Sequence, residues 1–257
     1  MIQNLRKTII IFLFMLLAKD LFAEELIIRV PHDDYPPFFM TSKTGKKVGL
    51  SIELSNVLLE KTGIKVKYMA LPFPRGLWYL KTGEIHMMLN LSIKKDRAEY
   101  INFLGPQLDE TVVLVVLKNS NIKIKSCDDF KKLSKPIGIE RKKYYGKKFD
   151  HKFKTDKIFK KNIEVVNDVI ANERKLSMDR ISGFLGYGYN IYFRFKKANL
   201  YKKFKIHPLV LHRDFVYFGF SKKSVPDYLL KILQKAFEKS VKSGAFEKIK
   251  RRYRVYQ

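Results

Sequence analysis

The chain has 257 residues, 46% hydrophobic and 14% aromatic, a composition that is typical of globular proteins and excludes a disordered chain. Its 52 basic residues outnumber its 25 acidic ones, giving a formal net charge of +27, a surplus that favours nucleic acid or an anionic membrane surface as a partner. The lysines are spread from Lys43 to Lys250 without a basic-aromatic RNA-binding motif or a zinc finger, so we expect no nucleic-acid partner. We interpret the surplus as a solvated basic surface, with electrostatic steering of anionic ligands as the alternative.

The thiol and imidazole groups indicate neither disulfides nor a metal site. Cys127 is the only cysteine, so no internal disulfide can form and packing must hold the fold together. The five histidines are scattered along the chain, at positions 32, 86, 151, 207 and 212, and they form no Cys/His cluster of the kind that holds a metal. We therefore expect no metal and no cofactor.

The N-terminus has the pattern of a secretory signal peptide. Arg6 and Lys7 precede the apolar run Thr8–Ala18, and the small residue Ala23 marks a cleavage site. The run is about half the roughly 20 residues that a membrane-spanning helix needs. We expect cleavage after Ala23, release into the periplasm of a Gram-negative cell, and no lipid anchor because no cysteine lies near the cut.

The first part of the mature chain predicts alternating strands and helices. Apolar, β-branched residues indicate a strand at Glu25–Val30, and prolines make Pro31–Phe39 a loop that carries aromatic side chains. Apolar residues at helical spacing follow Gly49 and end before Gly63. Further along the chain we expect a strand at 64–68, a helix at 75–81 and a strand at 85–89. This order favours a parallel sheet with loops open at the carboxyl ends of its strands.

A second α/β run follows. The expected elements are a strand at 111–117, a helix near 128–133, a strand at 136–139, helix-like segments to about 176, and strands at 181–185 and 216–220. The last part of the chain predicts an amphipathic helix with Ser224 as N-cap and Pro226 in its first turn, stopped by Gly244. A short basic helix at 245–253 completes the chain.

Several motifs in this order resemble those of the bacterial extracellular solute-binding proteins of family 3, the polar amino acid class, from about Glu25 to Tyr253. The motifs are Tyr35-Pro-Pro-Phe38, Gly49-Leu-Ser-Ile-Glu-Leu54, Leu80-Lys-Thr-Gly-Glu-Ile85, Asn90-Leu-Ser-Ile-Lys-Lys-Asp-Arg97 with Ile101-Asn-Phe-Leu-Gly-Pro106, and Phe218-Gly-Phe-Ser221 with the closing basic helix. Each motif alone is weak, and five in order carry the assignment.

The resemblance implies an α/β protein with the type II periplasmic binding protein fold, in which two lobes close on a ligand cleft. It places the first lobe at about 24–115 and 216–257 and the second at 116–215. Thr111–Leu117 and Val216–Phe220 would be the strands that cross between the lobes. We expect a monomer with two partners, a small-molecule ligand and the membrane permease of an ABC importer.

The resemblance also implies the ligand-binding residues of the first lobe. Arg97 matches the arginine that grips a ligand carboxylate, for which a guanidinium offers two parallel N–H donors. Ser92 matches a position that adds a hydrogen bond to the same carboxylate, and Asn90 begins the motif. The other expected contacts are the aromatic pair Tyr35 and Phe38 and the helix residues Arg75 and Trp78. For Phe39, a place in the core and a place in the ligand cleft are equally expected.

The second lobe departs from the family pattern. Relatives that bind amino acids carry an acid on the loop after the strand matching 181–185, where it holds the ligand ammonium, and here that position is Tyr187. An ammonium buried without a partner would be costly. Either Glu140 supplies the charge, or the ligand is a carboxylate without an ammonium, in which case ordinary amino acids should bind weakly.

Three functions remain open at the level of the sequence. The first is capture of an amino acid-like or organic acid solute for an ABC importer, without enzymatic activity. The second is a cyclohexadienyl dehydratase-like enzyme on the same scaffold, which would need a general acid or base such as Glu53, His86 or Glu140. The third is a secreted sensory or interaction protein that acts through a membrane partner.

Overall fold

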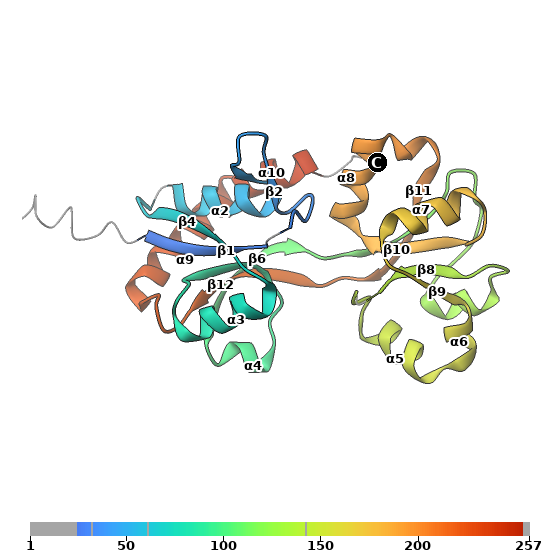
Figure 1. Ribbon diagram of the computed structural model, residues 1–257, viewed down its shortest axis with the longest axis horizontal. Coiled ribbons are helices and arrows are strands. Elements are labelled where there is room, and N and C mark those ends of the chain that lie inside the picture. Colours follow the sequence, from blue (N-terminus) through green and yellow to red (C-terminus); the bar gives the residue numbers. More distant parts are fainter. Residues whose placement is uncertain (1–24, 32, 61, 142, 254–257) are drawn as a thin grey trace, which may run out of the picture. The chain divides into compact units, whose positions relative to one another are not determined.

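The computed structural model describes residues 25–31, 33–60, 62–141 and 143–253 (Figure 1). The chain forms two compact units. Unit 1 contains the chain up to Tyr35, Phe39–Gly105 and Tyr217–Glu247, and unit 2 contains Pro36–Phe38, Pro106–Val216 and the chain from Lys248. The predicted signal peptide lies outside the described residues, and within them no helix is both long and apolar enough to span a membrane.

Unit 1 is built on a five-stranded sheet of order β4-β1-β5-β12-β6. Its strands are β1 (Glu25–Val30), β4 (Lys65–Ala70), β5 (Met87–Leu91), β6 (Ile101–Asp109) and β12 (Phe215–Ser221). β1 pairs in parallel with β4 and β5, as the order of elements predicts, and β12 runs antiparallel to β5. A two-stranded ribbon of β2 (Met40–Thr41) and β3 (Lys47–Val48) precedes the first helix.

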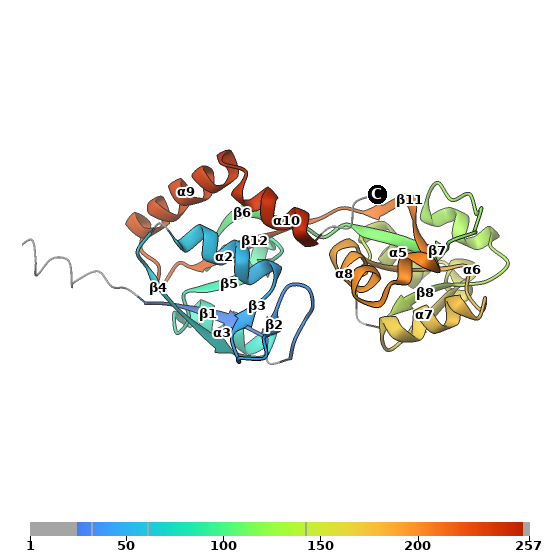
Figure 2. The same cartoon turned by 90° about the horizontal axis from the view of Figure 1, so that it is seen from above.

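The helices of unit 1 follow the predicted apolar spacing. They are α2 (Leu50–Glu60), α3 (Phe73–Thr82) and α9 (Asp227–Lys242), together with the short α4 (Lys95–Ala98), which was not predicted. The helix α10 (Ala245–Tyr253) begins in unit 1 and continues into unit 2 from Lys248. α2 and α9 lie side by side (Figure 2), and α9 buries Leu229, Leu233 and Phe237. Gly83 ends α3 in the left-handed conformation, with φ of 88°, which glycine adopts without steric cost.

Unit 2 has its own five-stranded sheet, of order β11-β7-β10-β8-β9. Its strands are β7 (Val112–Leu117), β8 (Ile137–Glu140), β9 (Ile163–Val166), β10 (Gly183–Tyr187) and β11 (Phe204–His212). The helices are α5 (Lys147–Thr155), α6 (Lys157–Lys161), α7 (Val169–Ser177) and α8 (Gly188–Ala198), with a 3₁₀ turn at Cys127–Lys132.

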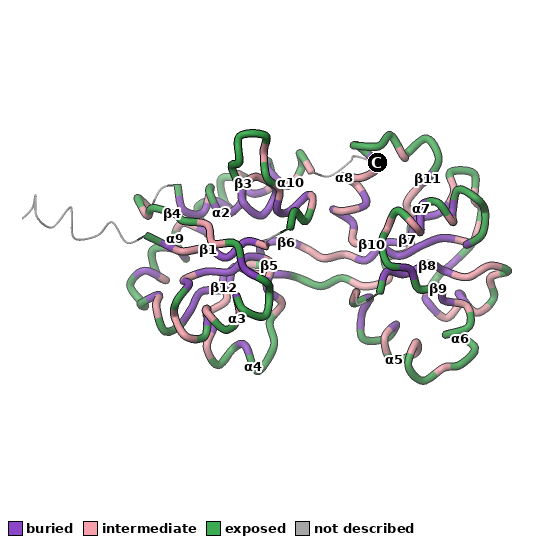
Figure 3. Tube along the Cα trace, viewed as in Figure 1, coloured by how far each residue is buried: buried purple, intermediate pink, exposed green. Residues whose placement is uncertain are grey.

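Both faces of this sheet are buried (Figure 3). Val112, Leu114 and Val116 of β7 pack on one face with a cluster of phenylalanines, and Val113 and Val115 pack on the other. This alternation is the period of two that a strand imposes on its side chains. An apolar core on each face explains how the unit holds together without a disulfide, with Cys127 buried as a free thiol.

The structure differs from the expected elements in three respects. The second lobe was expected from 116, and unit 2 begins at Pro106, within β6, whose pairing belongs to the first sheet, while the lobe bounds stay a prediction. The helix α9 begins after Pro226, and Ser224 donates its hydroxyl to the carbonyl of Ile85 instead of capping the helix. β6, β9, β11 and α8 were not predicted as separate elements, because their sequences mix apolar, polar and Gly or Pro residues without a clean period.

Candidate ligand-binding site

Arg97 is the residue of unit 1 with the clearest features of a ligand-binding group. It lies in the four-residue α4 and is only 9% exposed. One of its guanidinium nitrogens donates to the carbonyl oxygen of Ser92 at 3.2 Å, and its Cζ lies 5.5 Å from the ring centroid of Phe73. No carboxylate of the described residues forms an ion pair with it. A buried guanidinium without an acidic partner favours an external anion.

A second arginine, which the sequence analysis missed, lies at the same aromatic ring. Arg29 of β1 is 8% exposed, donates its Nε–H to the carbonyl oxygen of Leu71 at 2.8 Å, and places its Cζ 5.6 Å from the Phe73 centroid. Burial lowers the pKa of Arg29 to about 10. The two guanidinium groups make this part of unit 1 strongly positive.

The remaining residues of the Asn90–Arg97 motif support the backbone around Arg97. Asn90 adopts a left-handed conformation with φ of 58°, and its side-chain oxygen accepts a hydrogen bond from the Ser51 hydroxyl at 2.8 Å. A non-glycine residue in this conformation stores strain that commonly accompanies functional sites. Ser92 is half-buried and holds Arg97 through its carbonyl oxygen, which leaves its hydroxyl and N–H for other contacts.

The two predicted aromatic contacts have different environments. Tyr35 is 37% exposed and pairs its backbone with Phe39, which itself is buried. Phe38 is 2% exposed and meets Tyr189 edge to face, with ring centroids 6.1 Å apart. Phe38 is therefore covered by protein, whereas Tyr35 offers an accessible ring.

The helix residues proposed as contacts lie on the surface of α3. Trp78 is 59% exposed and Arg75 is exposed. Among the described residues, neither side chain has a ring contact like that of Arg97 with Phe73. The ligand-binding role of Arg75 and Trp78 stays a prediction.

In unit 2, Tyr187 ends β10 and its phenol donates to the carbonyl oxygen of Tyr144 at 2.9 Å. The ammonium nitrogen of Lys143 lies 5.5 Å from the centre of its ring. Burial, followed by the nearby Glu110 carboxylate, raises the pKa of Tyr187 above its ordinary value. The phenol is therefore neutral at physiological pH.

Glu140 ends β8 and is 8% exposed. Its carboxylate forms an ion pair with the ammonium group of Lys143 at 2.8 Å, and its backbone N–H donates to the hydroxyl of Tyr145 at 2.8 Å. The negative charge of Glu140 is thus already compensated within the chain. Its expected role as the partner of a ligand ammonium stays a prediction.

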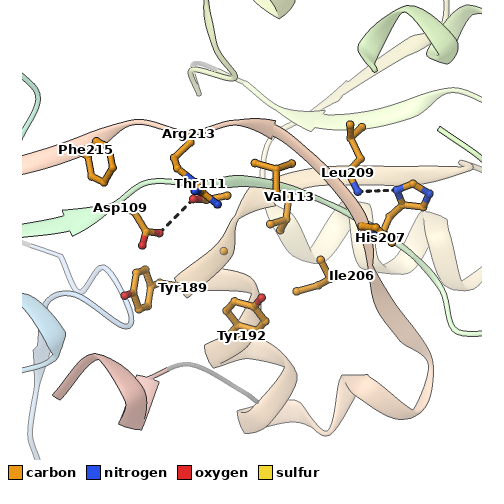
Figure 4. Close-up of a pocket in the computed structure, with 13 residues that line it drawn as sticks. Asp109, Thr111, Val113, Tyr189, Tyr192, Ile206, His207, Leu209, Arg213 and Phe215 are labelled. Atoms are coloured by element: carbon orange, nitrogen blue, oxygen red, sulfur yellow. Dashed lines mark hydrogen bonds between the residues drawn. The ribbon is translucent and has the colours of Figure 1, made fainter. Parts of the chain in front are cut away.

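A pocket of about 640 Å³ opens on the other face of the unit 2 sheet (Figure 4). Asp109, Thr111 and Val113 line one side of it, and Tyr189 and Tyr192 of α8 approach it from below in that view. None of the ligand-binding residues expected from the sequence lines this pocket. It is not the predicted site.

No metal site is formed by the described part of the chain. No group of three or more His, Cys, Asp or Glu side chains there is placed to hold an ion.

Comparison with known families identifies the chain. The sequence profile of the bacterial extracellular solute-binding proteins, family 3, matches residues 27–255. The chain belongs to this family. The match spans both units and includes every site residue described above.

Relatives within and around the family agree in fold. "Probable amino-acid-binding protein YxeM" of Bacillus subtilis is 26% identical over 220 residues, which are 85% of this chain and 80% of that protein. An ancestral cationic amino acid solute-binding protein has a TM-score of 0.72 at 18% identity, covering 90% of this chain and 96% of its own. The L-cystine solute receptor of Neisseria gonorrhoeae has a TM-score of 0.69 at 16% identity, covering 90% and 93%. The family member described here has the type II periplasmic binding protein fold.

Proposed function

We propose that this protein captures a small carboxylated solute, an amino acid or a close analogue, outside the cytoplasmic membrane and delivers it to the permease of an ABC importer. The observation that carries the proposal is the buried guanidinium of Arg97, which has no acidic partner among the described residues. The family and its amino-acid-binding relatives support the class of solute. The proposal does not include a chemical step.

The carboxylate of the solute would bind to Arg97. Two parallel N–H···O bonds fit a carboxylate without reorganisation, and the neighbouring Arg29 adds positive potential. The hydroxyl or backbone N–H of Ser92 would complete the set of donors. Because Arg97 is buried and stacked on Phe73, little side-chain entropy would be lost on binding.

Replacing Arg97 with alanine tests the proposal. We expect Arg97→Ala to lose roughly 2–5 kcal/mol of binding free energy, about 30-fold to several-thousand-fold in affinity, because it removes one partner of a buried charge pair. Arg97→Lys should also bind the solute weakly, since an ammonium group does not reproduce the two parallel N–H donors of a guanidinium. Calorimetry with the amino acids that raise the melting temperature of the wild-type protein measures the effect.

Lys95→Ala is the matched control, because it removes an exposed cation from α4, the helix that carries Arg97. It should change the affinity less than Arg97→Ala does. Unchanged affinity in the Arg97→Ala variant, with its fold intact, would remove Arg97 from the site. Delivery to an importer is tested separately, by co-purification of membrane permeases with the tagged protein and by solute uptake in a deletion strain.

A further inference from the structure

A pocket of about 420 Å³ lies in unit 2 at the edge of its sheet, where β9 is the last strand. Its walls come from β8, the loop after β8, β9, α5 and α6, and the two helices pack against each other (Figure 1). Every residue that lines the pocket belongs to unit 2. The volume is within the range of pockets that hold small molecules.

The apolar part of the lining is the open end of a hydrophobic core. In the parallel pairing of β8 with β9, Ile163 and Val165 stand opposite Ile137 and Ile139, so all four side chains share one face of the sheet. Ile163 is 8% exposed and belongs to the core cluster of that face, whereas Val165 is 37% exposed. The core therefore covers the first residue of the pair and leaves the second one open to the pocket.

Aromatic rings of α5 continue this apolar wall. Phe149 is buried and Phe153 is half-buried, with the two rings stacked at 6.1 Å between centroids, and both line the pocket. An exposed valine beside aromatic rings is an apolar surface that a ligand can cover, which is favourable in proportion to the area removed from water.

Three cations line the same pocket without an ion pair. They are Arg141 after β8, Lys154 in α5 and Lys160 in α6, all exposed. None of them forms an ion pair with a described carboxylate. The ammonium nitrogen of Lys160 lies 5.8 Å from the centre of the Phe153 ring, so charge and apolar surface are in contact.

Other lysines of the same region are balanced within the chain. Lys148 and Lys152 of α5 both pair with Asp128, at 3.0 and 2.5 Å. Lys143, which also lines the pocket, pairs with Glu140 at 2.8 Å. The remaining acid of the lining is Asp150, a single carboxylate against the three unpaired cations. The pocket therefore has an excess of positive charge beside its apolar wall.

We propose that this pocket is a second binding site, which takes a small organic anion with its aromatic or aliphatic body against Phe153 and Val165 and its anionic group at Lys154 and Lys160. An inorganic anion would meet only exposed ammonium groups, which hold it weakly, and would leave the apolar wall uncovered. The site shares no residue with the Arg97 site, and the inference does not depend on the proposed function.

Two fluorescent probes that differ only by a sulfonate test the inference. They are 8-anilinonaphthalene-1-sulfonate and its neutral parent N-phenyl-1-naphthylamine, both titrated into the full-length protein. We expect the wild-type protein to bind the sulfonate at least about fivefold more tightly than the neutral probe, because only the sulfonate meets the unpaired cations. Raising the ionic strength from about 0.05 M to 0.5 M should remove most of this difference.

The double variant Lys154→Gln, Lys160→Gln removes two cations of the lining. Its affinity for the sulfonate should fall about tenfold, and its affinity for the neutral probe should stay within about twofold of the wild type. Lys161→Gln is the matched control, because Lys161 is an exposed cation of the same helix that does not line the pocket. This control should change neither affinity by more than about twofold.

Val165→Thr tests the apolar wall. Threonine keeps the β-branched shape that suits a strand, so the fold should be retained. The affinity for both probes should fall about threefold, because a hydroxyl replaces a methyl group at the exposed end of the core. An unchanged affinity for both probes would show that they do not contact this wall, and would contradict the inference.

The remaining outcomes separate this inference from the proposed function. Equal sulfonate affinity in the double variant and the wild type, or an equal loss in Lys161→Gln, would overturn the second site. Displacement of the sulfonate by an amino acid that stabilises the wild-type protein would place the probe in the solute site, so the inference would fall and the proposed function would stand. Arg97→Ala that loses the solute and keeps the sulfonate would support both.

Discussion

Three charged side chains of the described residues are buried or half-buried without forming an ion pair with a group of opposite charge. Arg97 and Arg29 in unit 1 are almost completely buried without an acid, and Glu110 in unit 2 has a carboxylate without a hydrogen bond or ion pair among the described residues. Groups of this kind reduce the stability of the free protein. A ligand of opposite charge that binds to such a group offsets this loss, and its binding therefore stabilises the folded protein.

The stability of the free protein should therefore depend on the pH through Glu110. Its pKa in the folded protein is about 7, above the ordinary value of 4.5. The folded state then binds more protons at Glu110 than the unfolded state does between these values, so the contribution of Glu110 to stability is fully present below about pH 4.5 and is lost as the pH rises through 7. Glu110→Gln should stabilise the ligand-free protein at pH 8 by about 1–3 kcal/mol, after allowance for partial exposure.

Calorimetric melting of the wild-type and Glu110→Gln proteins at pH 8 and pH 5 measures this difference. The gain in melting temperature should be larger at pH 8 than at pH 5. Asp109→Asn serves as the comparison on the same backbone segment. A Glu110→Gln variant that is less stable than the wild type at pH 8 would show that the carboxylate makes a favourable contact in the native protein.

At the scale of single elements, α3 and β1 together position the two arginines. The side chain of Arg29 runs beneath α3, and a Cβ atom at Gly76 of that helix would stand 2.9 Å from its Cγ. Phe73 in the first turn of α3 supplies the ring that both guanidinium groups approach. The glycine is thus required by the close approach of β1, and a larger residue there must displace Arg29.

Gly76→Ala should destabilise the protein by up to about 2 kcal/mol. An alanine gains roughly 1 kcal/mol in helix propensity, but overpacking of a buried contact typically costs about 1–3 kcal/mol. Solute affinity should also fall, because the displaced Arg29 shares the Phe73 ring with Arg97. Denaturant unfolding and calorimetry check the two effects.

Gly83→Ala is the matched comparison within the same helix. It strains a backbone with φ of 88°, but a Cβ there meets only the flexible side chain of Lys223. It should lower stability by a similar amount without a loss of solute affinity. Equal effects of the two variants on affinity would contradict a role of the Arg29 contact in binding.

At the scale of the whole molecule, the dominant property is the positive charge. The formal net charge of +27 is spread over the chain, and the described ion pairs are mostly between partly exposed side chains, which contribute little to stability. Two roles for this charge stay open: a solvated basic surface, and a long-range field that would raise the local concentration of anions.

The association rate of an anionic solute should therefore depend on salt. Raising the ionic strength from about 0.01 M to 0.5 M shortens the screening length severalfold and should slow the binding of a monoanion such as glutaramate several-fold. The zwitterion L-glutamine, with no net charge, should be affected less. Stopped-flow measurements on both probes check this, and equal salt dependence for the two would assign the basic residues to solubility alone.

The sequence by itself determined the family and the order of most elements, and it singled out Arg97, whose binding of a carboxylate stays a prediction. These conclusions depend on local signals, such as the apolar spacing of α2 and α9, the glycine after α3 and the motif that ends at Arg97, and such signals survive without knowledge of long-range contacts. The same local reasoning placed the start of α9 incorrectly, because Ser224 bonds to the carbonyl oxygen of Ile85, a partner far away in the sequence.

The tertiary structure alone decided which charges lie together. In the sequence, Arg29 is one charged residue within an apolar strand. Only the packing of β1 against α3 brings it to the ring of Phe73, which Arg97 also approaches. Glu110 carries no motif, and only the register of β7 against β10 makes it a neighbour of Tyr187. Both depend on pairings between segments far apart in the chain, and a side chain's surroundings and charge balance are set by those pairings rather than by its sequence neighbours.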